Sequence, residues 1–408
     1  MRILFLAFEV PYPLDRGGRI KTFHYLKALA CNHQVSLVVL TRTQACVEKL
    51  DRLRSMLSLV DVHSIPIDLS RFRKARLAFN SLWRSEPVVM SLYANAEGKR
   101  LVERLLDDGH FDWVYADHLH MAQYVPDPAR ALTLLDQHNV ESVILRRFAD
   151  RQSLRPVRWF ARREQRKMSR YEAEMCRRFD AIWVTTEVDR ELIRPWLLPQ
   201  QHVDVMPIGV DTGYFQPDSR KRDPQTVISV GTLSWPPNAD SVLWFYDDIF
   251  SLVKKQVPDT KFVIVGANPP PSIRQLAEDP CVEVTGWVDD IRPYMARSTV
   301  MVVPLRGGSG MRVKILNALA TGLPVVSTSV GCEGIAVTPG SDILVADSAD
   351  AFIEQIVVLF KAPQLQRRLS ENGVRLIQER YSWNAIYRQI ESSVAAISKQ
   401  PSKNGWRQ

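Results

Sequence analysis

Cysteine is scarce in this sequence, and the cysteines that occur form no pattern. They are Cys31, Cys46, Cys176, Cys281 and Cys332. An odd and scattered set predicts no disulfide framework, and no pair has the spacing of a metal-binding site. The sequence therefore favours a reducing compartment and excludes a small disulfide-bonded fold.

Long hydrophobic runs are also absent. The apolar run at the N-terminus covers only about seven residues before Glu9, and no A-x-A-like cleavage site follows it. No stretch reaches the roughly 20 apolar residues that span a bilayer. We therefore expect a soluble, cytoplasmic protein with neither a signal peptide nor a transmembrane segment.

Acidic residues are outnumbered by basic ones. The chain has 53 Lys and Arg against 45 Asp and Glu, which gives a formal net charge of +8. An excess of this sign favours a negatively charged partner, such as nucleotide phosphates, anionic lipid or nucleic acid. The hydrophobic fraction of 46% is that of a globular protein with a full core.

Short β-rich runs recur along the chain with helix-length segments between them. The runs are 3–8, 35–40, 112–116, 132–136, 181–186 and 203–208 in the first half, and 226–231, 261–266, 282–286, 299–305, 324–329 and 342–346 in the second. Continuous Val, Ile and Leu runs indicate parallel strands that are buried on both faces. Two such series predict an α/β protein of two doubly wound, Rossmann-like domains that face a central cleft.

A polar, proline-flanked stretch predicts the boundary between the two domains. The sequence over 216–225 is QPDSRKRDPQ, which is typical of a linker. We expect a first domain over 1–218, a second over 219–381 and an amphipathic helix over 382–398. Parallel α/β sheets bind ligands at the carboxyl ends of their strands, so the loops at those ends carry the candidate sites.

The first candidate site is the loop after the strand at 299–305. It reads RGGSGMRVK, in which Gly307, Gly308, Ser309 and Gly310 precede Met311, Arg312 and Lys314. Small residues at a helix N-terminus let peptide N–H groups approach an anion closely. We expect the amides to hold a diphosphate while two cations in the first turn of the helix neutralise its charge. The alternative is a tight turn with solvated cations.

Further candidates follow strands of the first domain. Gly17 and Gly18 open a helix just after the first strand and allow close approach of a ligand. His138 follows the strand at 132–136, where an imidazole can stabilise developing charge or be satisfied by local backbone. Asp117 and His118 follow the strand at 112–116. We expect substrate contacts there, since no third ligand closes a metal site with His118 and His120.

One segment is strongly basic. Residues 146–170 contain nine arginines and Lys167 against Asp150 and Glu164, with Trp159, Phe160 and Met168 as scattered apolar residues. A basic amphipathic helix is typical of a protein that contacts an anionic membrane surface. A solvated helix face explains the run equally well. Nucleic acid is disfavoured, because no DNA- or RNA-binding motif accompanies it.

Taken together, the motifs resemble the retaining glycosyltransferases of family 4, which have the GT-B fold. The resemblance covers nearly the whole chain and is strongest over 225–335. It rests on RGGRIKTFHYLKALA, LLDQHNVES, VMPIGVDTGYF, VISVGTLSWPPNADSVLWF, VEVTGWVDDIRPYMARSTVMVVPL and SGMRVKILNALATGLPVVST, in that order. The phrasing around GTLSWPPN is similar to that of a bacterial subgroup for exopolysaccharide or surface-glycan assembly.

This resemblance implies a place for each part of a nucleotide-sugar donor. The second domain would hold the nucleotide, and the helix at 382–398 would return to the first domain. The base would lie near Trp287 and Val288, and the diphosphate would lie near Gly231, Thr232 and the 307–314 loop. Gly18 would close over the donor from the first domain, and His138 would contact its sugar. Members of the family usually work without a metal, and no cofactor is expected besides the donor itself.

Two departures from the family pattern change the expected chemistry. The family has two glutamates eight positions apart, where this chain has Ser309 and Asn317. Because Asn317 replaces a charged hydrogen bond to the ribose by a neutral one, we expect a loss of about tenfold in donor affinity. The GTLSWPPN segment lacks the cations that many members place on the diphosphate. Arg312 and Lys314 would replace them.

The predicted function is therefore transfer of a hexose from a nucleotide-diphosphate sugar to a glycan or lipid-linked acceptor. Asp117 and His118 would lie on the acceptor side, and His138, Arg312 and Lys314 would be catalytic. The protein would work in the cytoplasm, at the inner face of the membrane if the basic run binds lipid. The alternative is an inactive GT-B partner subunit that binds a nucleotide sugar or glycan. An epimerase is disfavoured, because it would require carboxylates around the sugar.

Overall fold

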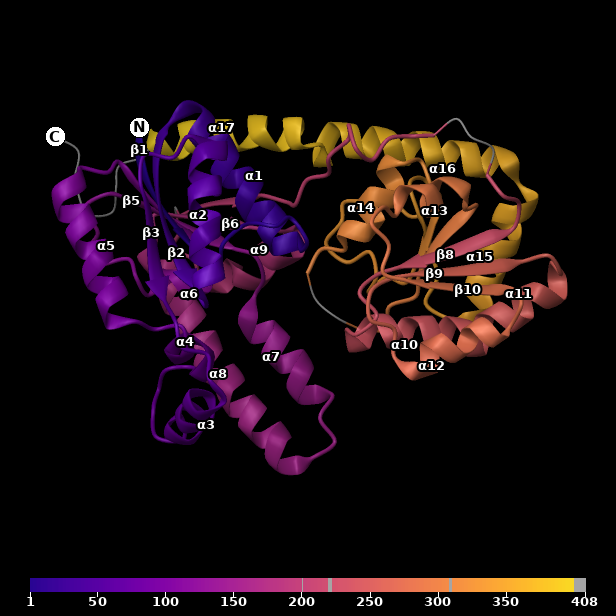
Figure 1. Ribbon diagram of the computed structural model, residues 1–408, viewed down its shortest axis with the longest axis horizontal. Helices are drawn as coiled ribbons and strands as arrows, with labels where there is room; N and C mark the ends of the chain where they lie inside the picture. Colours follow the sequence, from indigo (N-terminus) through magenta and orange to yellow (C-terminus); the bar gives the residue numbers. More distant parts are fainter. Residues whose placement is uncertain (200, 219–221, 308–309, 400–408) are drawn as a thin grey trace. The chain divides into compact units, whose positions relative to one another are not determined.

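The protein folds into two compact units. The structure is a computed structural model that describes residues 1–199, 201–218, 222–307 and 310–399, apart from the side chains of residues 44–47. Unit 1 contains Met1–Ile208 and the chain from Tyr387 onward, and unit 2 contains Gly209–Ile386. Figure 1 shows that each unit has a β-sheet of its own with helices packed against it.

Unit 1 is built on a parallel sheet. Its strands in the described residues are β1 (Arg2–Ala7), β2 (Gln34–Thr41), β3 (Val62–Pro66), β4 (Trp113–Asp117), β5 (Leu132–Gln137), β6 (Ala181–Val184) and β7 (His202–Val205). They pair in the order β3-β2-β1-β4-β5-β6-β7. The central strands are buried along nearly their whole length, because helices cover both faces. The strand order reverses between β1 and β4, which is where such sheets bind ligands.

The helices of unit 1 fill the connections between these strands. They are α1 (Gly17–Asn32), α2 (Gln44–Leu57), α3 (Arg71–Asn80), α4 (Val88–Leu92), α5 (Ala96–Gly109), α6 (Leu119–Ala122), α7 (Glu141–Asp150), α8 (Arg155–Arg178), α9 (Glu187–Ile193) and the 3-10 turn η1 (Arg194–Trp196). The helix α8 is the longest of these and packs along α7. Two carboxylate oxygens of Glu172 accept hydrogen bonds from the amides of Glu141 and Ser142, which satisfies free N–H groups at the start of α7.

Unit 2 repeats the same plan. Its strands in the described residues are β8 (Thr226–Val230), β9 (Lys261–Val265), β10 (Val282–Gly286), β11 (Val300–Val303), β12 (Val325–Ser327) and β13 (Leu344–Val345). They pair in parallel in the order β10-β9-β8-β11-β12-β13, with the reversal between β8 and β11. A core of Val, Ile, Leu and Phe side chains, among them Phe245, Phe250 and Phe262, lies against this sheet.

The helices of unit 2 lie on both faces of its sheet (Figure 1). They are α10 (Pro236–Trp244), the π-helical turn η2 (Phe245–Phe250), α11 (Ser251–Gln256), α12 (Pro271–Arg274), η3 (Gln275–Glu278), α13 (Arg292–Arg297), α14 (Val313–Ala320), α15 (Ala349–Lys361), α16 (Pro363–Leu376) and the π-helical turn η4 (Ile377–Tyr381). Helix α17 (Trp383–Ser398) begins in unit 2 and ends in unit 1.

The division between the units follows local contacts. It falls between Ile208 and Gly209, whereas the sequence analysis expected it between residues 218 and 219. Val210 forms a β-bridge with Ser382, and the hydroxyl of Tyr214 donates a hydrogen bond of 3.3 Å to Asp290. These contacts attach the residues just before the expected linker to unit 2.

The sequence analysis predicted the strand series closely. Each predicted run contains a strand of the structure, and the two Rossmann-like units confirm the predicted α/β architecture. Strand β3 was not predicted, because VHSIP is short and only Ile65 is fully buried in it. Among the residues that the structure describes, no helix is long and apolar enough to cross a membrane.

Candidate functional site

A buried polar cluster lies at the carboxyl ends of β4 and β5 in unit 1. Asp117 ends β4, and its register partner on β5 is Asp136. His138 comes one residue after the end of β5, and Lys21 and Thr22 reach the cluster from α1. This place is next to the reversal of strand order, where parallel sheets present functional side chains.

Lys21 and Asp136 form a fully buried ion pair in this cluster. Their side chains are 0% and 1% exposed, and Lys21 Nζ lies 2.7 Å from Asp136 Oδ1. The hydroxyl of Tyr115 donates to the other carboxylate oxygen at 2.6 Å, and Thr185 lies 3.3 Å from the ammonium group. A buried charge that lost its partner would be costly, so these contacts hold Asp136 in a single arrangement.

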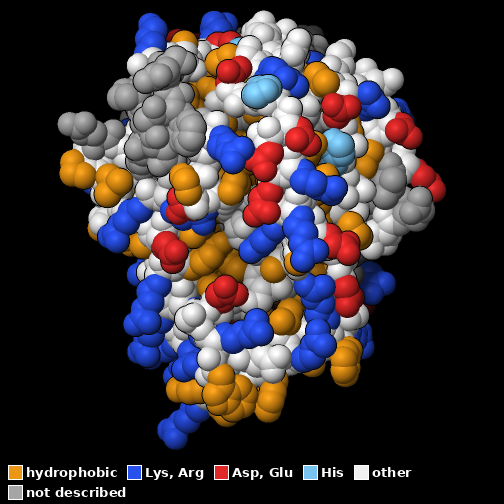
Figure 2. All heavy atoms as spheres, turned by 90° about the vertical axis from the view of Figure 1, so that its left-hand side faces the viewer, with side chains coloured by type: hydrophobic (Ala, Val, Ile, Leu, Met, Phe, Trp, Pro, Cys, Tyr) orange, Lys and Arg blue, Asp and Glu red, His pale blue; other side chains and the backbone are white. Residues whose placement is uncertain are grey.

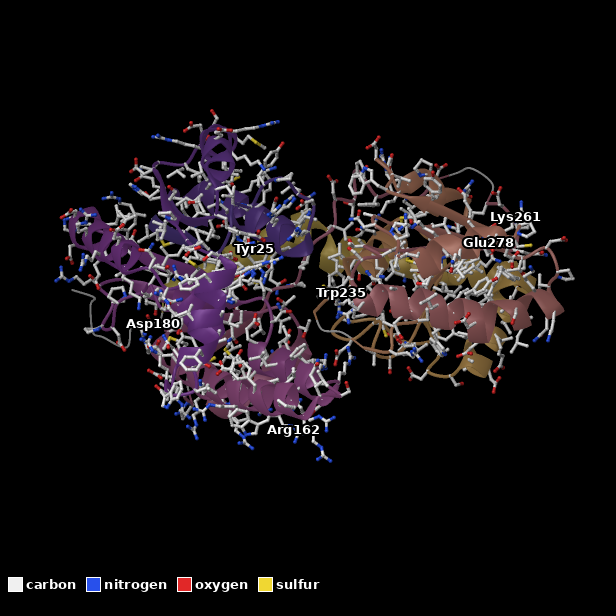
Figure 3. All side chains as sticks on the ribbon, turned by 60° about the horizontal axis from the view of Figure 1, so that its bottom comes forward. Tyr25, Arg162, Asp180, Trp235, Lys261 and Glu278 are labelled. Carbon is white, nitrogen blue, oxygen red and sulfur yellow. The ribbon has the colours of Figure 1, made fainter. Side chains whose placement is uncertain are left out.

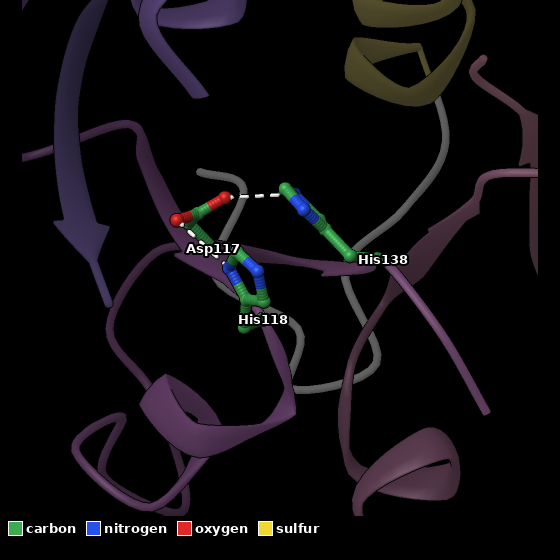
Figure 4. Close-up of side chains that lie close together, drawn as sticks. All are labelled: Asp117, His118 and His138. Atoms are coloured by element: carbon green, nitrogen blue, oxygen red, sulfur yellow. Dashed lines mark ion pairs between the residues drawn. The ribbon is translucent and has the colours of Figure 1, made fainter. Parts of the chain in front are cut away.

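His138 lies between two carboxylates. Its Nε2 is 2.9 Å from Asp117 Oδ1 and 3.2 Å from Asp136 Oδ2. His118 contacts the other oxygen of Asp117 through Nδ1 at 3.0 Å, and its ring lies on that of His138 with the centroids 3.6 Å apart. Figure 4 shows Asp117 facing both imidazoles. Thr22 donates to the same carboxylate at 3.0 Å.

The charges in this cluster shift its pKa values in opposite directions. Burial and Lys21 oppose protonation of His138, but the two carboxylates outweigh them and raise its pKa. Burial and the charge of His138 lower the pKa of His118. Burial opposes ionisation of Asp136, but Lys21 and His138 outweigh burial and lower the pKa of Asp136 to about 2. The environment therefore favours the charged form of His138 over that of His118.

The backbone of His118 is strained. Its φ of 68° with ψ of 151° is a conformation that residues other than glycine rarely adopt. The strained turn brings His118 Nε2 within 3.9 Å of where a Cβ of Gly18 would lie. A Cβ on Gly18, at the start of α1, would therefore be in van der Waals contact with the imidazole of His118.

The same three side chains also meet the distance requirement of a metal site. One ligand atom each of Asp117, His118 and His138 lies within 4.8 Å of the others. The sequence analysis weighed a metal at His118 and His120 and disfavoured it. His120 is buried against Phe8 and Tyr93, and burial lowers its pKa to about 3, so it packs in the core as a neutral side chain.

A second cluster lies in unit 2, at the carboxyl ends of β8 and β9. Gly231 follows β8 and Gly266 follows β9, and a Cβ on Gly266 would lie 1.8 Å from the carbonyl oxygen of Gly231. Only glycine allows this approach of the two backbones. A Cβ on Gly231 would lie 2.8 Å from the amide nitrogen of Asn238 and 3.1 Å from Lys314 Nζ. The loop after β8 therefore lies directly against two polar side chains.

Lys314 and Arg312 bring two cations to this cluster. Lys314 Nζ donates to Asn238 Oδ1 at 3.0 Å, and the amide group of Asn238 donates to the carbonyl of Thr232 at 2.9 Å. Burial and the nearby charge of Arg312 lower the pKa of Lys314 to about 7. Two like charges held together beside a glycine loop form an environment that favours an anion.

The structure corrects one detail of the predicted diphosphate loop. Helix α14 begins at Val313, so Arg312 is its N-cap residue and does not lie in the first turn as predicted. Arg312 is only 6% exposed, and its guanidinium donates to the carbonyl of Gly310. Gly310 has a φ of 79°, which suits glycine. Gly308 and Ser309 lie outside the described residues.

The other predicted donor residues differ in exposure. Trp287 follows β10 and is 72% exposed, which leaves its ring available for stacking, and Val288 beside it is half-buried. Thr232 is exposed after β8, and Met311 is buried before α14. Asn317 lies one turn after Lys314 on α14. These residues follow the carboxyl ends of β8, β10 and β11, as the parallel sheet requires.

Several residues of the two clusters were not predicted as site residues. Lys21, Thr22 and Asp136 of unit 1 were missed, as was Asn238 of unit 2. Lys21 reads as a cation on the polar face of α1, and its partner Asp136 is 115 residues away. The available signal was Asp136 itself, a carboxylate that ends a continuous apolar strand.

The architecture is that of the GT-B fold, in which one chain carries two Rossmann-like units. The solved structure of HepE from Anabaena, in complex with UDP, matches it with a TM-score of 0.67 and 13% identity, over 97% of this chain and all of that one. Residues 224–362 match the family described as "Glycosyl transferases group 1". The fold and this match support a GT-B glycosyltransferase.

Two curated relatives are similar in sequence. An uncharacterized 44.6 kDa protein in the cps region of Klebsiella pneumoniae is 23% identical over 95% of this chain and 98% of its own length. The MMP alpha-(1->4)-mannosyltransferase of Mycolicibacterium hassiacum is also 23% identical, over 59% of each chain.

Proposed function

We propose that this protein is a retaining glycosyltransferase that moves a hexose from a nucleotide-diphosphate sugar to a hydroxyl of a glycan or lipid-linked acceptor. The observation that carries the proposal is the pair of cations Arg312 and Lys314 at the start of α14, next to the Gly231 loop. The match of 224–362 to a glycosyltransferase family and the UDP complex of HepE support it.

The proposed chemistry is stabilisation of the leaving diphosphate. Cleavage of the bond between the anomeric carbon and the diphosphate oxygen leaves negative charge on that oxygen. The cations Arg312 and Lys314 and free peptide N–H groups at the start of α14 would stabilise this charge. The acceptor oxygen forms the new bond on the same face of the sugar and gives up its proton to the departing diphosphate oxygen. Neither a side-chain nucleophile nor a metal is required.

The polar cluster of unit 1 would act on the sugar. Asp117 and Asp136 raise the pKa of His138, and in its protonated form it can donate a hydrogen bond to a sugar oxygen and stabilise charge during bond cleavage. Asp117 and His118 would contribute to the acceptor side. Membership of family 4 stays a prediction, and so does a part in exopolysaccharide assembly. The relative from a cps region supports the second of these.

Calorimetry with nucleotides tests the diphosphate site. We expect UDP, GDP, ADP or TDP to bind with at least tenfold higher affinity than its nucleoside, and Lys314→Met to remove most of that difference. Arg367→Gln, on the exposed side of α16, is the matched control and should bind as the wild type does. If no nucleoside diphosphate binds better than its nucleoside, the proposed site is wrong.

Turnover distinguishes the enzyme from an inactive partner subunit, an alternative that Asn317 in place of a family glutamate supports. The measurement is release of the nucleoside diphosphate from a panel of nucleotide sugars, with and without a cell-extract acceptor. Release that His138→Gln lowers at unchanged nucleotide affinity supports the enzyme. Tight binding without release from any donor supports the partner subunit.

A further inference from the structure

Unit 1 carries a group of large apolar side chains that its core does not bury. Phe72, Phe79 and Trp83, on α3 and just after it, are 77%, 65% and 72% exposed. Leu154, Val157 and Trp159, at the start of α8, are 65%, 38% and 59% exposed. We call these six residues the α3–α8 patch. Figure 2 shows hydrophobic side chains gathered at the lower end of this face among Lys and Arg.

Helix α3 contributes nothing to the hydrophobic core. It has the sequence RFRKARLAFN and contains no buried residue. Phe79 packs edge-on against Trp83 with the ring centroids 5.1 Å apart, and both rings still face solvent. Single exposed apolar residues are common, but a cluster of exposed aromatic residues marks an interaction surface.

The patch is held on a defined framework. Lys167 of α8 donates to the carbonyl of Ser81 at 2.5 Å, and the amide of Val88 donates to Glu164 of α8 at 2.8 Å. Arg163, one turn after Trp159, donates to the carbonyl of Leu82. The turn that carries Trp83 is therefore fixed to α8 one turn from Trp159.

Cations surround the patch. Helix α3 carries Arg71, Arg73, Lys74 and Arg76 and no acidic residue. On α8, Arg155, Arg162 and Arg166 are exposed, and Figure 3 shows Arg162 reaching away from the helix. The nearby acids are fewer: Asp150 lies 3.5 Å from Arg162, and Asp68 and Glu86 flank α3 and its turn.

In the structure, contacts within the protein occupy part of the basic run over 146–170. Arg158 donates to the carbonyl of Gln152 between α7 and α8, and Lys167 pairs with Glu164 at 2.7 Å within α8, so both cations are taken up by contacts inside unit 1. Further positive surface comes from Arg71, Lys74 and Arg76 of α3, which the sequence analysis did not include. Half of the apolar residues of the patch, Phe72, Phe79 and Trp83, lie outside the run.

We propose that the α3–α8 patch docks on the surface of a bilayer that contains anionic lipid. Aromatic and aliphatic side chains would enter the headgroup region while the surrounding cations meet lipid phosphates. Charge complementarity favours this partner over a second copy of the chain, which would bring cations against cations. The exposed aliphatic side chains of Leu154 and Val157 favour a bilayer over nucleic acid, because nucleic acid binds cations but offers little apolar volume in which to bury them.

Flotation with liposomes tests the apolar half of the patch. The full chain is mixed at low salt with vesicles of phosphatidylcholine alone or with 30% phosphatidylglycerol. We expect binding only to the anionic vesicles. The variant Phe72→Ser/Phe79→Ser/Trp83→Ser should lose at least about tenfold in vesicle affinity, because these side chains supply the inserted surface. Their exposure predicts unchanged thermal unfolding.

A second variant tests the charged half. Arg71→Gln, Lys74→Gln and Arg76→Gln together should lower vesicle affinity by up to about 100-fold, since each cation near an anionic surface contributes about fivefold. Arg73 stays, because it donates to the carbonyl of Ala94.

A matched control separates local from net charge. Lys361→Gln, Arg367→Gln and Arg375→Gln remove the same charge from exposed positions of α15 and α16 in unit 2. Vesicle binding should stay within about twofold of the wild type. No binding at low salt, or equal losses in the charge variant and this control, overturns the proposal.

Two further outcomes assign the patch to other partners. Binding to a single-stranded RNA homopolymer that the patch variants abolish, without vesicle binding, indicates nucleic acid. A concentration-dependent dimer that the aromatic variant abolishes, again without vesicle binding, indicates a second copy. Vesicle binding requires no turnover, so this test is independent of the proposed enzyme activity.

Discussion

The pKa of Lys314 makes the diphosphate site testable by pH alone. Burial and the charge of Arg312 lower this pKa to about 7 in the unliganded protein. A bound diphosphate would favour the charged ammonium and raise the pKa again. Binding should therefore take up a proton above pH 7, and the affinity should fall as the pH rises.

The size of the effect follows from the fraction of Lys314 that is protonated. With a pKa of about 7, about half of the lysine is charged at pH 7 and about 1% at pH 9. If only the charged form binds, affinity falls by about 50-fold over this range, or about 2.3 kcal/mol. The phosphate of the ligand has a pKa near 6 and is already ionised.

Calorimetry between pH 7 and pH 9 in buffers of different ionisation enthalpy measures both the affinity and the proton uptake. Lys314→Arg keeps a charge that does not titrate here, so its affinity should change little with pH. Lys261→Arg, on the exposed start of β9, should retain the wild-type dependence. A wild-type affinity that stays constant from pH 7 to pH 9 refutes the reasoning.

The same shift affects the unliganded protein. Between pH 7 and pH 10 the unfolded chain binds more protons at Lys314 than the folded chain does, because the folded pKa is the lower one. The free energy of unfolding should therefore rise with pH across this window. Lys314→Met should reduce that rise, which chemical denaturation at pH 7 and pH 9.5 can measure. An undiminished rise in the variant would mean that other groups cause it.

Three other predictions concern the two clusters. Gly231→Ala should lower nucleoside diphosphate affinity at least tenfold by calorimetry, because its Cβ would lie 3.1 Å from Lys314 Nζ. Asp136→Asn should destabilise the chain by about 3–5 kcal/mol in urea, and Lys21→Met added to it should recover much of the loss; additive losses would contradict this. Zinc or EDTA should leave the melting temperature unchanged, because Asp117 already pairs with His138; zinc stabilisation that His118→Gln abolishes would indicate a metal site.

The sequence predicts local features of this protein better than long-range partners. Continuous apolar runs predict the strands, and the positions after them predict Asp117, His118 and His138, because parallel strands end on the same edge of a sheet. The structure brings these three residues together. No local pattern indicates that Lys21 is buried, because its partner Asp136 lies 115 residues further along the chain.

The diphosphate loop illustrates the same limit. Its glycines and cations are visible in the sequence, and so is their position after a buried strand. The contact between Lys314 and Asn238 is not visible in the sequence, because 76 residues separate them. The exact start of α14 was also missed by one position, since Arg312 has non-helical φ and ψ. Helix ends depend on local hydrogen bonds that periodicity does not encode.

The two clusters differ in how their charges are balanced, and this difference bears on function. In unit 1, Lys21 and His138 lie against Asp117 and Asp136, so opposite charges compensate one another. Such a cluster can be held rigid without any ligand. In unit 2, burial and the like charge of Arg312 lower the pKa of Lys314. That arrangement costs stability unless an anion is bound, which is the expected trade-off at a binding site.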